Sequence, residues 1–485
     1  MLYCFIGFSI VLSFFNFLSF RSLTLDEAML SLNILDHSFV ELLQPLDRNQ
    51  VAPIGFLFIE KCVVTILGDS DWCLRLLPYL SYLLSIVLIY KLNRLLFKSS
   101  KIALLASAIF SLNFLVLNYS IEVKQYSTDI FTSLLLIISF LNYLKQSNRK
   151  SLFYYSVIAI LSIWLSNISI IILFSIGLFT LYSFYKNKKQ EVLKASLPLM
   201  LGLGSFCIYY VLFINNHPTK AMMVDYWGKA GAFLPYDVFS LDFYQSLFLK
   251  VELLFKTVLV SKRLWLISLL FVLIAIITSL KKDKIILVLL LPILVHLGLS
   301  YFKLYPFDVR LVLYLVPLLI SLISAGIIFT YDYLTVKNIK IGVLLVLFPL
   351  VTSLYIAYKK VPVQIEEIKE SMAYMNTHIN PKDTIYVYYS SEPAFLFYKK
   401  NYPQIDALNS IIWGNGIRGR DKSVKEVELS RLSGDFWMLF SHLDQKGPYD
   451  VSPEEAYFIK NLKTKGYRIE HQKTNYGSTV YKFVK

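Results

Sequence analysis

Long apolar runs separated by short polar turns make up the first three quarters of the chain. A helix needs about 20 apolar residues to cross a bilayer. Eleven runs come close to that length, near residues 2–20, 76–97, 102–118, 127–144, 151–166, 168–185, 195–215, 260–280, 285–301, 311–331 and 340–358. The pattern predicts a polytopic α-helical membrane protein with about 11 transmembrane helices, which form a transmembrane domain over residues 1–362.

Basic residues are divided unevenly between the turns. Short cytoplasmic loops of membrane proteins carry an excess of Lys and Arg. Five alternate turns hold 14 such residues: Lys98, Lys101, Lys145, Arg149, Lys150, Lys186, Lys188, Lys189, Lys194, Lys281, Lys282, Lys284, Lys337 and Lys340. The three short turns on the other side hold only three, Lys124, Lys303 and Arg310. We therefore expect a cytoplasmic N-terminus and, after an odd number of spans, an extracytoplasmic C-terminal domain.

Three outer segments are long enough to fold. Residues 21–75 mix charged and apolar positions, which indicates helices lying on the surface. Residues 216–259 contain an amphipathic stretch from Phe239 to Phe255, typical of an interfacial helix. Residues 363–485 alternate helical and strand patterns and predict a small α/β domain. Its expected helices are 364–378, 391–400 and 452–465, and its expected strands are 384–389, 436–441 and a hairpin of 467–473 with 478–484.

Composition supports a membrane protein and argues against a nucleic-acid-binding one. The chain is 56% hydrophobic and 17% charged, below the charged share of a typical soluble protein. The net charge of +15 arises mostly in the short turns, because residues 363–485 hold 17 Lys and Arg against 15 Asp and Glu. Cys62 and Cys73 share the first outer segment, so the sequence leaves a disulfide between them open.

Asp26 and Glu27 form an acidic pair just after the first apolar run. Two adjacent carboxylates can act as a general base or hold a divalent cation. They can equally be the acidic first turn of a helix that Thr24 caps. The residues alone favour the helix start.

Other charged residues lie where outer turns meet apolar runs. Glu122 and Lys124 occupy a very short turn, where desolvation makes ionisable groups costly and often functional. Arg310 begins the tenth run. Arg75 begins the second run and fits either a phosphate ligand or an interfacial anchor. His296, inside the ninth run, more often makes a hydrogen bond between helices than binds a ligand.

The sequence lacks the motifs of several enzyme classes. It contains no Walker A loop, no GxGxxG after a strand, no GxSxG and no HExxH. A nucleotide-driven pump, a dehydrogenase, a serine hydrolase and a zinc protease are thus unsupported, and no nucleotide cofactor is predicted.

An ordered set of short motifs resembles the GT-C membrane glycosyltransferases of the protein O-mannosyltransferase and aminoarabinose transferase type. The set covers about residues 1–330 and comprises Leu25-Asp26-Glu27, Pro53, Trp72-x-x-Arg75-Leu-x-Pro78, Ser120-x-Glu122-x-Lys124-x-Tyr126, Tyr305-Pro306-x-x-x-Arg310 and Pro317. The C-terminal domain resembles the extracytoplasmic domains that many such enzymes append. The resemblance implies a bacterial inner or plasma membrane protein.

The resemblance also implies an activity, which is transfer of a sugar from a polyprenyl-phosphate carrier to an extracytoplasmic acceptor. It assigns Asp26, with Glu27 beside it, to the catalytic centre of an inverting displacement. Lys124, Arg310 and Arg75, in that order, are expected to bind the lipid phosphate. Glu122, Tyr126, Pro53 and Tyr305 are expected to contact substrate. A divalent metal held by Asp26 and Glu27 is left open, as is the identity of the acceptor, whether a glycan, a lipid or a protein.

One departure from the family pattern concerns the sugar. The loop before Pro53 carries Asn49-Gln50 where aminoarabinose-transferase-like proteins often have a basic residue and paired prolines, which argues against aminoarabinose as the sugar.

The alternative functions are a lipid-linked glycan transporter without covalent transfer and a non-catalytic scaffold. The sequence shows neither repeated halves nor matching broken helices, which transporters commonly have. Truncation near residue 362 is expected to abolish the function of a scaffold and to leave an enzyme partly active.

Overall fold

The computed structural model describes residues 1–187, 193–215, 217–259, 265–337, 342–415, 422–443 and 447–485. The basic residues Lys188, Lys189 and Lys340 lie outside the described residues. The chain forms two compact units. Unit 1 comprises Met1–Leu18, Ser38–Gly68 and Trp72–Val361, and unit 2 comprises Ser19–His37, Asp69–Asp71 and Pro362–Lys485. Each unit is described separately.

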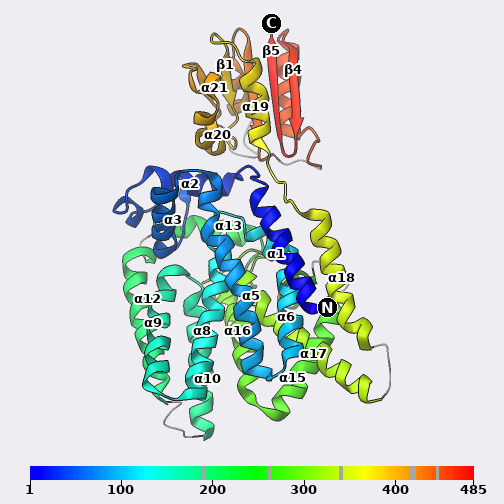
Figure 1. Ribbon diagram of the computed structural model, residues 1–485. Helices are drawn as coiled ribbons and strands as arrows, with labels where there is room; N and C mark the ends of the chain where they lie inside the picture. The colour runs from blue at the N-terminus through cyan, green and yellow to red at the C-terminus, as the bar shows by residue number, and fades with distance from the viewer. Residues whose placement is uncertain (188–192, 216, 260–264, 338–341, 416–421, 444–446) are drawn as a thin grey trace. The chain divides into compact units, whose positions relative to one another are not determined.

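Unit 1 is helical (Figure 1). Its α-helices are α1 (Leu2–Leu18), α3 (Ile54–Leu67), α5 (Leu76–Phe97), α6 (Ser100–Ser111), α7 (Phe114–Tyr119), α8 (Tyr126–Gln146), α9 (Arg149–Leu165), α10 (Ser169–Asn187), α12 (Ser196–Tyr209), α13 (Lys220–Lys229), α14 (Leu241–Leu259), α15 (Trp265–Lys282), α16 (Leu287–Tyr301), α17 (Val316–Val336) and α18 (Gly342–Lys360). The short helix α4 (Asp71–Leu74) begins in unit 2. Single turns of other helix types are η1 (Glu41–Leu43), η2 (Asp47–Asn49), η3 (Tyr210–Ile214), η4 (Lys284–Ile286) and η5 (Leu313–Leu315).

The expected polytopic membrane class is confirmed. Among the described residues, eight helices are long and apolar enough to cross a membrane, and they lie within 71–97, 126–146, 169–186, 196–214, 265–282, 284–301, 313–336 and 342–360. The helices α1 and α6 are apolar but shorter. A helix occupies each of the eleven predicted runs within the described residues. The count of about 11 spans stays a prediction.

One predicted span is broken. The run 102–118 divides into α6 and α7, because Asn113 ends one helix and caps the next by accepting the backbone N–H of Val116 at 3.0 Å. The buried amide of Asn113 also donates to the carbonyl oxygens of Thr257 and Val258 at 2.9 and 2.6 Å. The break thus joins this helix pair to the end of α14.

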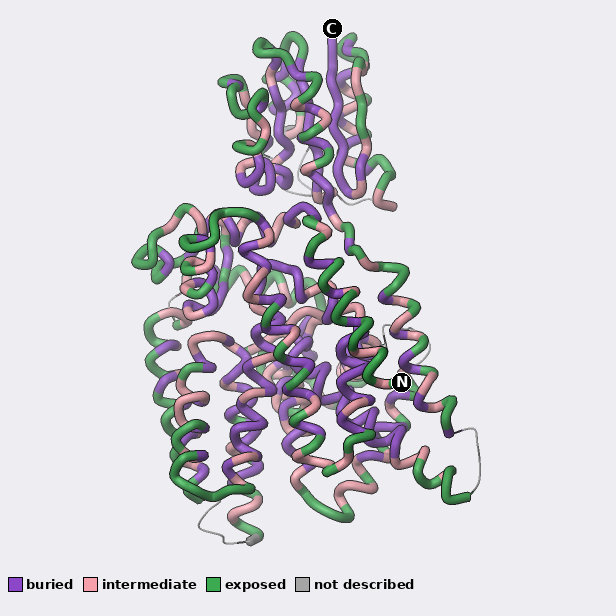
Figure 2. Tube along the Cα trace, viewed as in Figure 1, coloured by how far each residue is buried: buried purple, intermediate pink, exposed green. Residues whose placement is uncertain are grey.

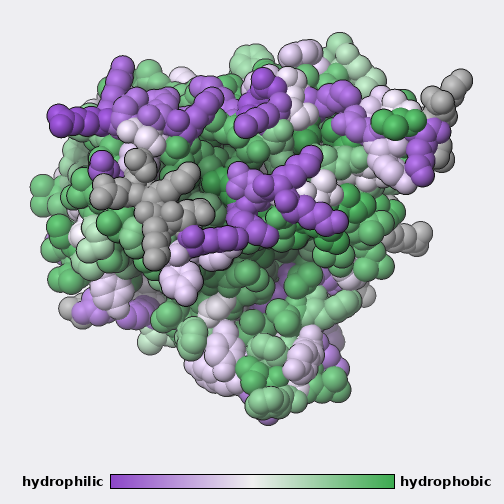
Figure 3. Space-filling model, turned by 90° about the horizontal axis from the view of Figure 1, so that it is seen from below, coloured by the Kyte–Doolittle hydropathy of each residue, from purple (hydrophilic) through white to green (hydrophobic). Residues whose placement is uncertain are grey.

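The interior of unit 1 is built around α17, which is buried over most of its length (Figure 2). Its Gly326 lets α15 approach closely, since a Cβ there would lie 2.0 Å from the carbonyl oxygen of Phe271. Half of the residues of the helix α12 are exposed, as suits a helix that faces lipid. The turns that carry most of the basic residues lie at one end of unit 1, where Figure 3 shows hydrophilic residues gathered among hydrophobic ones.

Unit 2 contains a five-stranded mixed sheet with the order β2-β1-β3-β5-β4. The strands are β1 (Thr384–Val387), β2 (Ile411–Trp413), β3 (Phe436–Ser441), β4 (Arg468–Asn475) and β5 (Ser478–Val484). The helices of unit 2 are α2 (Leu25–Asp36), α19 (Ile368–His378), α20 (Glu392–Tyr398), η6 (Lys399–Asn401), α21 (Pro403–Asp406), α22 (Lys422–Ser430) and α23 (Pro453–Thr464). β1 is parallel to β2 and β3, whereas β5 is antiparallel to β3 and β4.

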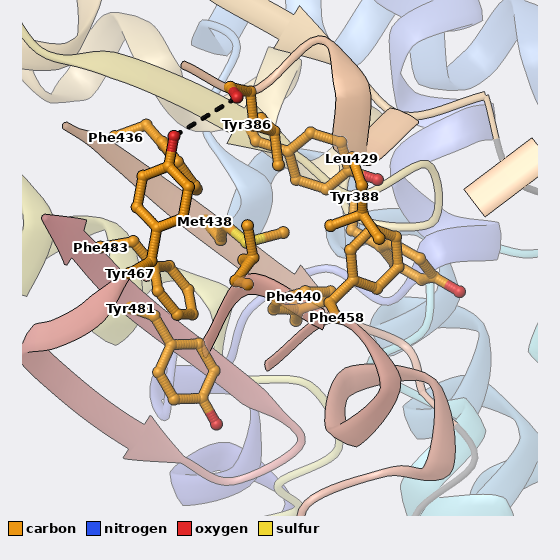
Figure 4. Close-up of a cluster of buried hydrophobic side chains, with 12 residues drawn as sticks. Tyr386, Tyr388, Leu429, Phe436, Met438, Phe440, Phe458, Tyr467, Tyr481 and Phe483 are labelled. Carbon is orange, nitrogen blue, oxygen red and sulfur yellow. Dashed lines mark hydrogen bonds between the residues drawn. The ribbon is translucent and has the colours of Figure 1, made fainter. Parts of the chain in front are cut away.

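Alternate residues of the central strands face two different layers of helices. One face packs against α22 and α23 in an aromatic cluster, and Figure 4 shows it together with the hydrogen bond from the Tyr467 hydroxyl to the Leu432 carbonyl oxygen at 3.4 Å. Trp437 is on the other face, where its ring lies 6.5 Å from that of Tyr374 in α19 and its indole donates to Asp383 at 3.0 Å. Helices on both faces explain why β1, β3 and β5 are almost wholly buried.

The expected α/β character of the C-terminal region is confirmed. β1, β3, the β4–β5 hairpin, α19, α20 and α23 coincide with predicted elements within a few residues. β2 and α22 were not predicted, because one is only three residues long and the other is strongly polar. The structure adds that Ser19–His37 fold as part of unit 2.

Candidate functional site

Asp26 and Glu27 lie in the first turn of α2, but their surroundings differ. Asp26 is half-buried, whereas Glu27 is completely buried. A single oxygen of Glu27, Oε2, accepts from Arg21 Nη1 at 2.6 Å, from the Thr24 backbone N–H at 3.0 Å and from the Thr24 hydroxyl at 3.1 Å. Glu27 therefore forms a capping contact and a buried ion pair, as in the helix-start interpretation of the acidic pair. Asp26 is the more exposed of the two carboxylates.

The described residues offer no ready metal centre. They contain no group of three or more His, Cys, Asp and Glu side chains placed to hold an ion. One oxygen of Glu27, Oε2, is held by Arg21 and Thr24. A divalent metal held by Asp26 and Glu27 stays a prediction. Cys62, which is exposed, and Cys73, which is buried, are not joined by the disulfide that the sequence left open.

Lys124 and Glu122 lie in the turn between α7 and α8, and both are buried. The turn is tight, since the Lys124 backbone N–H donates to the Glu122 carbonyl oxygen at 2.7 Å. Tyr126 begins α8, and its ring meets that of Tyr119 edge to face at 5.1 Å. Lys124 Nζ donates to the side-chain oxygen of Gln50 at 2.6 Å. The buried ammonium group is thus held in one place by a neutral partner.

Gln50 also lines a cavity of about 140 Å³. Its walls come from residues 42–46, 50–52, 54 and 57, from Asn167 and Tyr209, and from 211–214 and 217. Most of these residues are apolar, with a few polar groups among them, which is the usual composition of a ligand pocket. One wall is the π-helical turn Tyr210–Ile214, a deviation that often marks functional sites.

The predicted substrate residue Pro53 is buried and immediately precedes α3. It does not line the cavity, although its neighbours Ala52 and Ile54 do. The close packing of α3 depends on Gly55, because a Cβ there would lie 2.7 Å from the carbonyl oxygen of Trp164. Pro53 and Gly55 thus shape the segment that supplies Gln50.

Arg310 and Tyr305 belong to the turn between α16 and α17. The Arg310 guanidinium lies over the Trp227 ring at 5.2 Å. Burial raises the pKa of the Tyr305 hydroxyl, the Asp129 carboxylate raises it further and Arg310 lowers it, so both charges act on that hydroxyl. His296 bonds to the Tyr314 hydroxyl at 2.8 Å and to the Pro306 carbonyl oxygen at 3.0 Å. His296 is therefore the helix-to-helix contact expected of it, and it supports the turn.

Arg75, at the start of α5, is only 1% exposed. This burial argues against the interfacial-anchor interpretation, because an anchor keeps its guanidinium in water. The remaining interpretation from the sequence, a phosphate ligand, stays a proposal.

Three further ionisable residues of unit 1 were missed in the sequence. Asp129, in the first turn of α8, accepts a hydrogen bond from Ser166 at 2.5 Å. Lys250 of α14 donates to the Gly231 carbonyl oxygen at 3.0 Å, and burial lowers its pKa to about 8. Glu60 of α3 is completely buried with neither oxygen hydrogen-bonded in the described structure, and burial raises its pKa well above the usual value. A charge within an apolar run was the available signal for Asp129.

Comparison with known proteins gives a family-model match to part of the chain and a shared fold. A family model described as dolichyl-phosphate-mannose-protein mannosyltransferase matches residues 51–214. No curated protein sequence matches the chain. Among solved structures, ArnT from Cupriavidus metallidurans bound to undecaprenyl phosphate is similar, with a TM-score of 0.56, 11% identity and coverage of 99% of this chain and 97% of that one.

A second solved structure has the same fold. The Archaeoglobus fulgidus oligosaccharyltransferase in its apo form has a TM-score of 0.52, 12% identity and coverage of 91% of this chain and 69% of that one. At such identities the likeness shows the fold. The resemblance to GT-C membrane glycosyltransferases that the sequence motifs carried is confirmed, and the family-model match points to the same class of enzyme.

Proposed function

We propose that this protein is an integral-membrane glycosyltransferase that moves a sugar from a polyprenyl-phosphate carrier to an extracytoplasmic acceptor. The main support is Lys124, a buried ammonium group held by Gln50 at the edge of a mostly apolar cavity. A phosphate on a long apolar chain needs this combination of a fixed positive charge and an apolar wall. The fold shared with an ArnT bound to undecaprenyl phosphate supports the same ligand class.

We assign the lipid phosphate to Lys124 first and to Arg310 and Arg75 next. As the carrier leaves, its phosphate gains negative charge, which fixed cations stabilise at little reorganisation cost. Glu122, Tyr126 and Tyr305 adjoin these cations in sequence and are proposed to contact the sugar or its phosphate. Pro53 is proposed to act indirectly, by shaping the segment that presents Gln50.

We assign the general base to Asp26. Its carboxylate takes the proton of the acceptor hydroxyl while that oxygen attacks the anomeric carbon from the face opposite the phosphate. The bond between the anomeric carbon and the phosphate oxygen breaks, and both of its electrons stay with the polyprenyl phosphate. The anomeric configuration is therefore inverted. Asp26 then releases its proton to solvent.

The chemistry requires the outer segments to face the side on which the acceptor is found. The uneven distribution of Lys and Arg supports a cytoplasmic N-terminus and an extracytoplasmic C-terminal region. A bacterial inner or plasma membrane is the proposed location.

A transfer assay tests this function. Purified protein is incubated with radiolabelled polyprenyl-phosphate-linked sugars and with membranes of cells that lack the protein as the source of acceptor. We expect label to reach an acceptor, and we expect Asp26→Asn to lower the rate by about 10²–10⁴-fold, the usual contribution of a general base. Asp36→Asn, at the exposed far end of the same helix, is the matched control and should leave the rate unchanged.

Two outcomes contradict the proposal. Full activity of a well-folded Asp26→Asn variant removes the role of that residue. Translocation of a lipid-linked glycan across vesicles, with no covalent transfer from any donor tested, favours the transporter alternative.

A further inference from the structure

The segment that leads into α2 is held by side chains that lie more than 300 residues away in the sequence. Four successive backbone N–H groups, from Ser22 to Leu25, each donate to a side-chain oxygen. The acceptors in chain order are Glu367 Oε2 at 3.1 Å, the Tyr398 hydroxyl at 2.9 Å, Glu27 Oε2 at 3.0 Å and Glu366 Oε2 at 3.1 Å. All of these residues belong to unit 2.

This arrangement differs from ordinary helix capping. Of the four N–H groups, only that of Leu25 belongs to the first turn of α2, where the cap residue or water is the usual partner. The Thr24 N–H has a local partner, Glu27, and the other three depend on residues of the C-terminal region. Once unit 2 has folded, the segment directly before Asp26 is thus held by hydrogen bonds at four successive backbone N–H groups.

Further contacts fix the side chains that hold the segment. The other oxygen of Glu366 bonds to His442 Nδ1 at 2.5 Å, so this carboxylate is oriented from both sides. The Tyr398 hydroxyl donates to Asp71 at 3.0 Å, and Lys369 Nζ pairs with the same carboxylate at 2.9 Å. The Lys369 backbone N–H donates to the Ser22 hydroxyl at 3.1 Å.

We propose that Glu366, Glu367 and Tyr398 are positioning residues that set the place of the Asp26 carboxylate for proton transfer. This inference rests on the proposed function of Asp26. Leu25, which Glu366 holds, is the residue directly before Asp26, so a shift of its backbone moves the carboxylate. A displacement of about 1 Å at a reacting group can lower a rate by about 10²-fold. The C-terminal region is thus part of the catalytic apparatus.

Hydrogen–deuterium exchange of the full-length protein tests the structural half of the inference without any activity. In Glu366→Ala/Glu367→Ala, we expect the amides of residues 22–25 to exchange about tenfold faster, while the sheet keeps its protection. Unchanged exchange at 22–25 in this variant overturns the inference. Loss of protection throughout unit 2 shows a failure to fold, and the single variant Glu366→Ala, which removes only the acceptor of the Leu25 N–H, then replaces it.

The kinetic half of the inference is tested by measuring kcat and KM separately. We expect Glu366→Ala/Glu367→Ala to lower kcat by about 10²-fold with an unchanged KM for the lipid-linked donor. Glu428→Gln is the matched control, because this buried carboxylate of α22 accepts from the Tyr386 hydroxyl at 2.7 Å and from the Asn415 backbone N–H at 2.5 Å, away from residues 22–25. It should leave kcat unchanged.

The outcomes separate this inference from the proposed function. If the unmodified protein transfers sugar and Asp26→Asn abolishes the transfer, but Glu366→Ala/Glu367→Ala keeps its kcat, the positioning role is wrong and the function stands. If the unmodified protein transfers no sugar, the proposed function fails, and the positioning role for catalysis fails with it, whatever the exchange data show.

Discussion

Adjacent carboxylates at the start of α2 should respond to substitution in opposite ways. Glu27 is fully buried, and its Oε2 accepts three hydrogen bonds, one of them from the buried guanidinium of Arg21 at 2.6 Å. Glu27→Ala leaves that guanidinium without its counter-charge. Breaking a buried ion pair in this way costs about 3–5 kcal/mol of stability.

Glu27→Gln should be milder. The glutamine keeps an oxygen for the Thr24 N–H but loses the negative charge opposite Arg21. A hydrogen bond to a charged group contributes about 1.5–3 kcal/mol, so a loss of about 2 kcal/mol is expected. Asp26→Asn, at a half-buried position, should leave stability within about 0.5 kcal/mol of the unmodified protein while it removes transfer.

Thermal unfolding in detergent, followed by intrinsic fluorescence, is measured alongside transfer for the three variants. We expect the melting temperature to fall in the order Asp26→Asn, Glu27→Gln, Glu27→Ala, with residual transfer in any Glu27 variant that remains folded. If Glu27→Gln keeps the melting temperature of the unmodified protein and yet transfers no sugar, Glu27 acts in the chemistry and the structural role argued for it is wrong.

Three further predictions concern unit 1. Lys124→Met should weaken binding of undecaprenyl phosphate by at least about tenfold, because it removes the ammonium group held by Gln50, and a flotation assay with labelled lipid measures the change. Asn113→Ala should cost about 2–3 kcal/mol of stability, since it leaves the Thr257 and Val258 carbonyl oxygens without their donor, and thermal unfolding reports the loss. The raised pKa of Glu60 means that, as pH rises, the folded protein keeps the proton of this carboxyl group after the unfolded chain has released it. The contribution of this proton to the free energy of unfolding is therefore complete below about pH 4.3. It is lost at about 1.4 kcal/mol per pH unit as pH rises toward the folded pKa. Glu60→Gln should remove that slope, and stability of both proteins measured from pH 4 to pH 7 checks it.

The fold was largely predictable because its determinants are local. Apolar runs of membrane-spanning length mark their helices without reference to the rest of the chain. The β4–β5 hairpin follows from strand patterns on either side of Gly477, whose φ of 67° suits glycine in a turn. The break at Asn113 was missed because it depends on partners in α14, more than 140 residues further along the chain.

The candidate site was predictable only in part for the same reason. Asp26 and Lys124 could be selected from their positions beside apolar runs. The contact between Lys124 and Gln50 joins residues 74 positions apart, and no local sequence pattern predicts it. Asp129 could also have been selected from the sequence, since it is a carboxylate in the first turn of an apolar helix.

The contacts of residues 22–25 also change how one experiment must be interpreted. From the sequence, truncation near residue 362 was expected to separate an enzyme, which keeps some activity, from a scaffold, which loses its function. Truncation removes Glu366, Glu367 and Tyr398 together and leaves three backbone N–H groups before Asp26 without their acceptors. An enzyme then also loses most of its activity, so truncation no longer distinguishes it from a scaffold. Point variants do, because Asp26→Asn removes the chemistry while every contact of residues 22–25 with the C-terminal region stays in place.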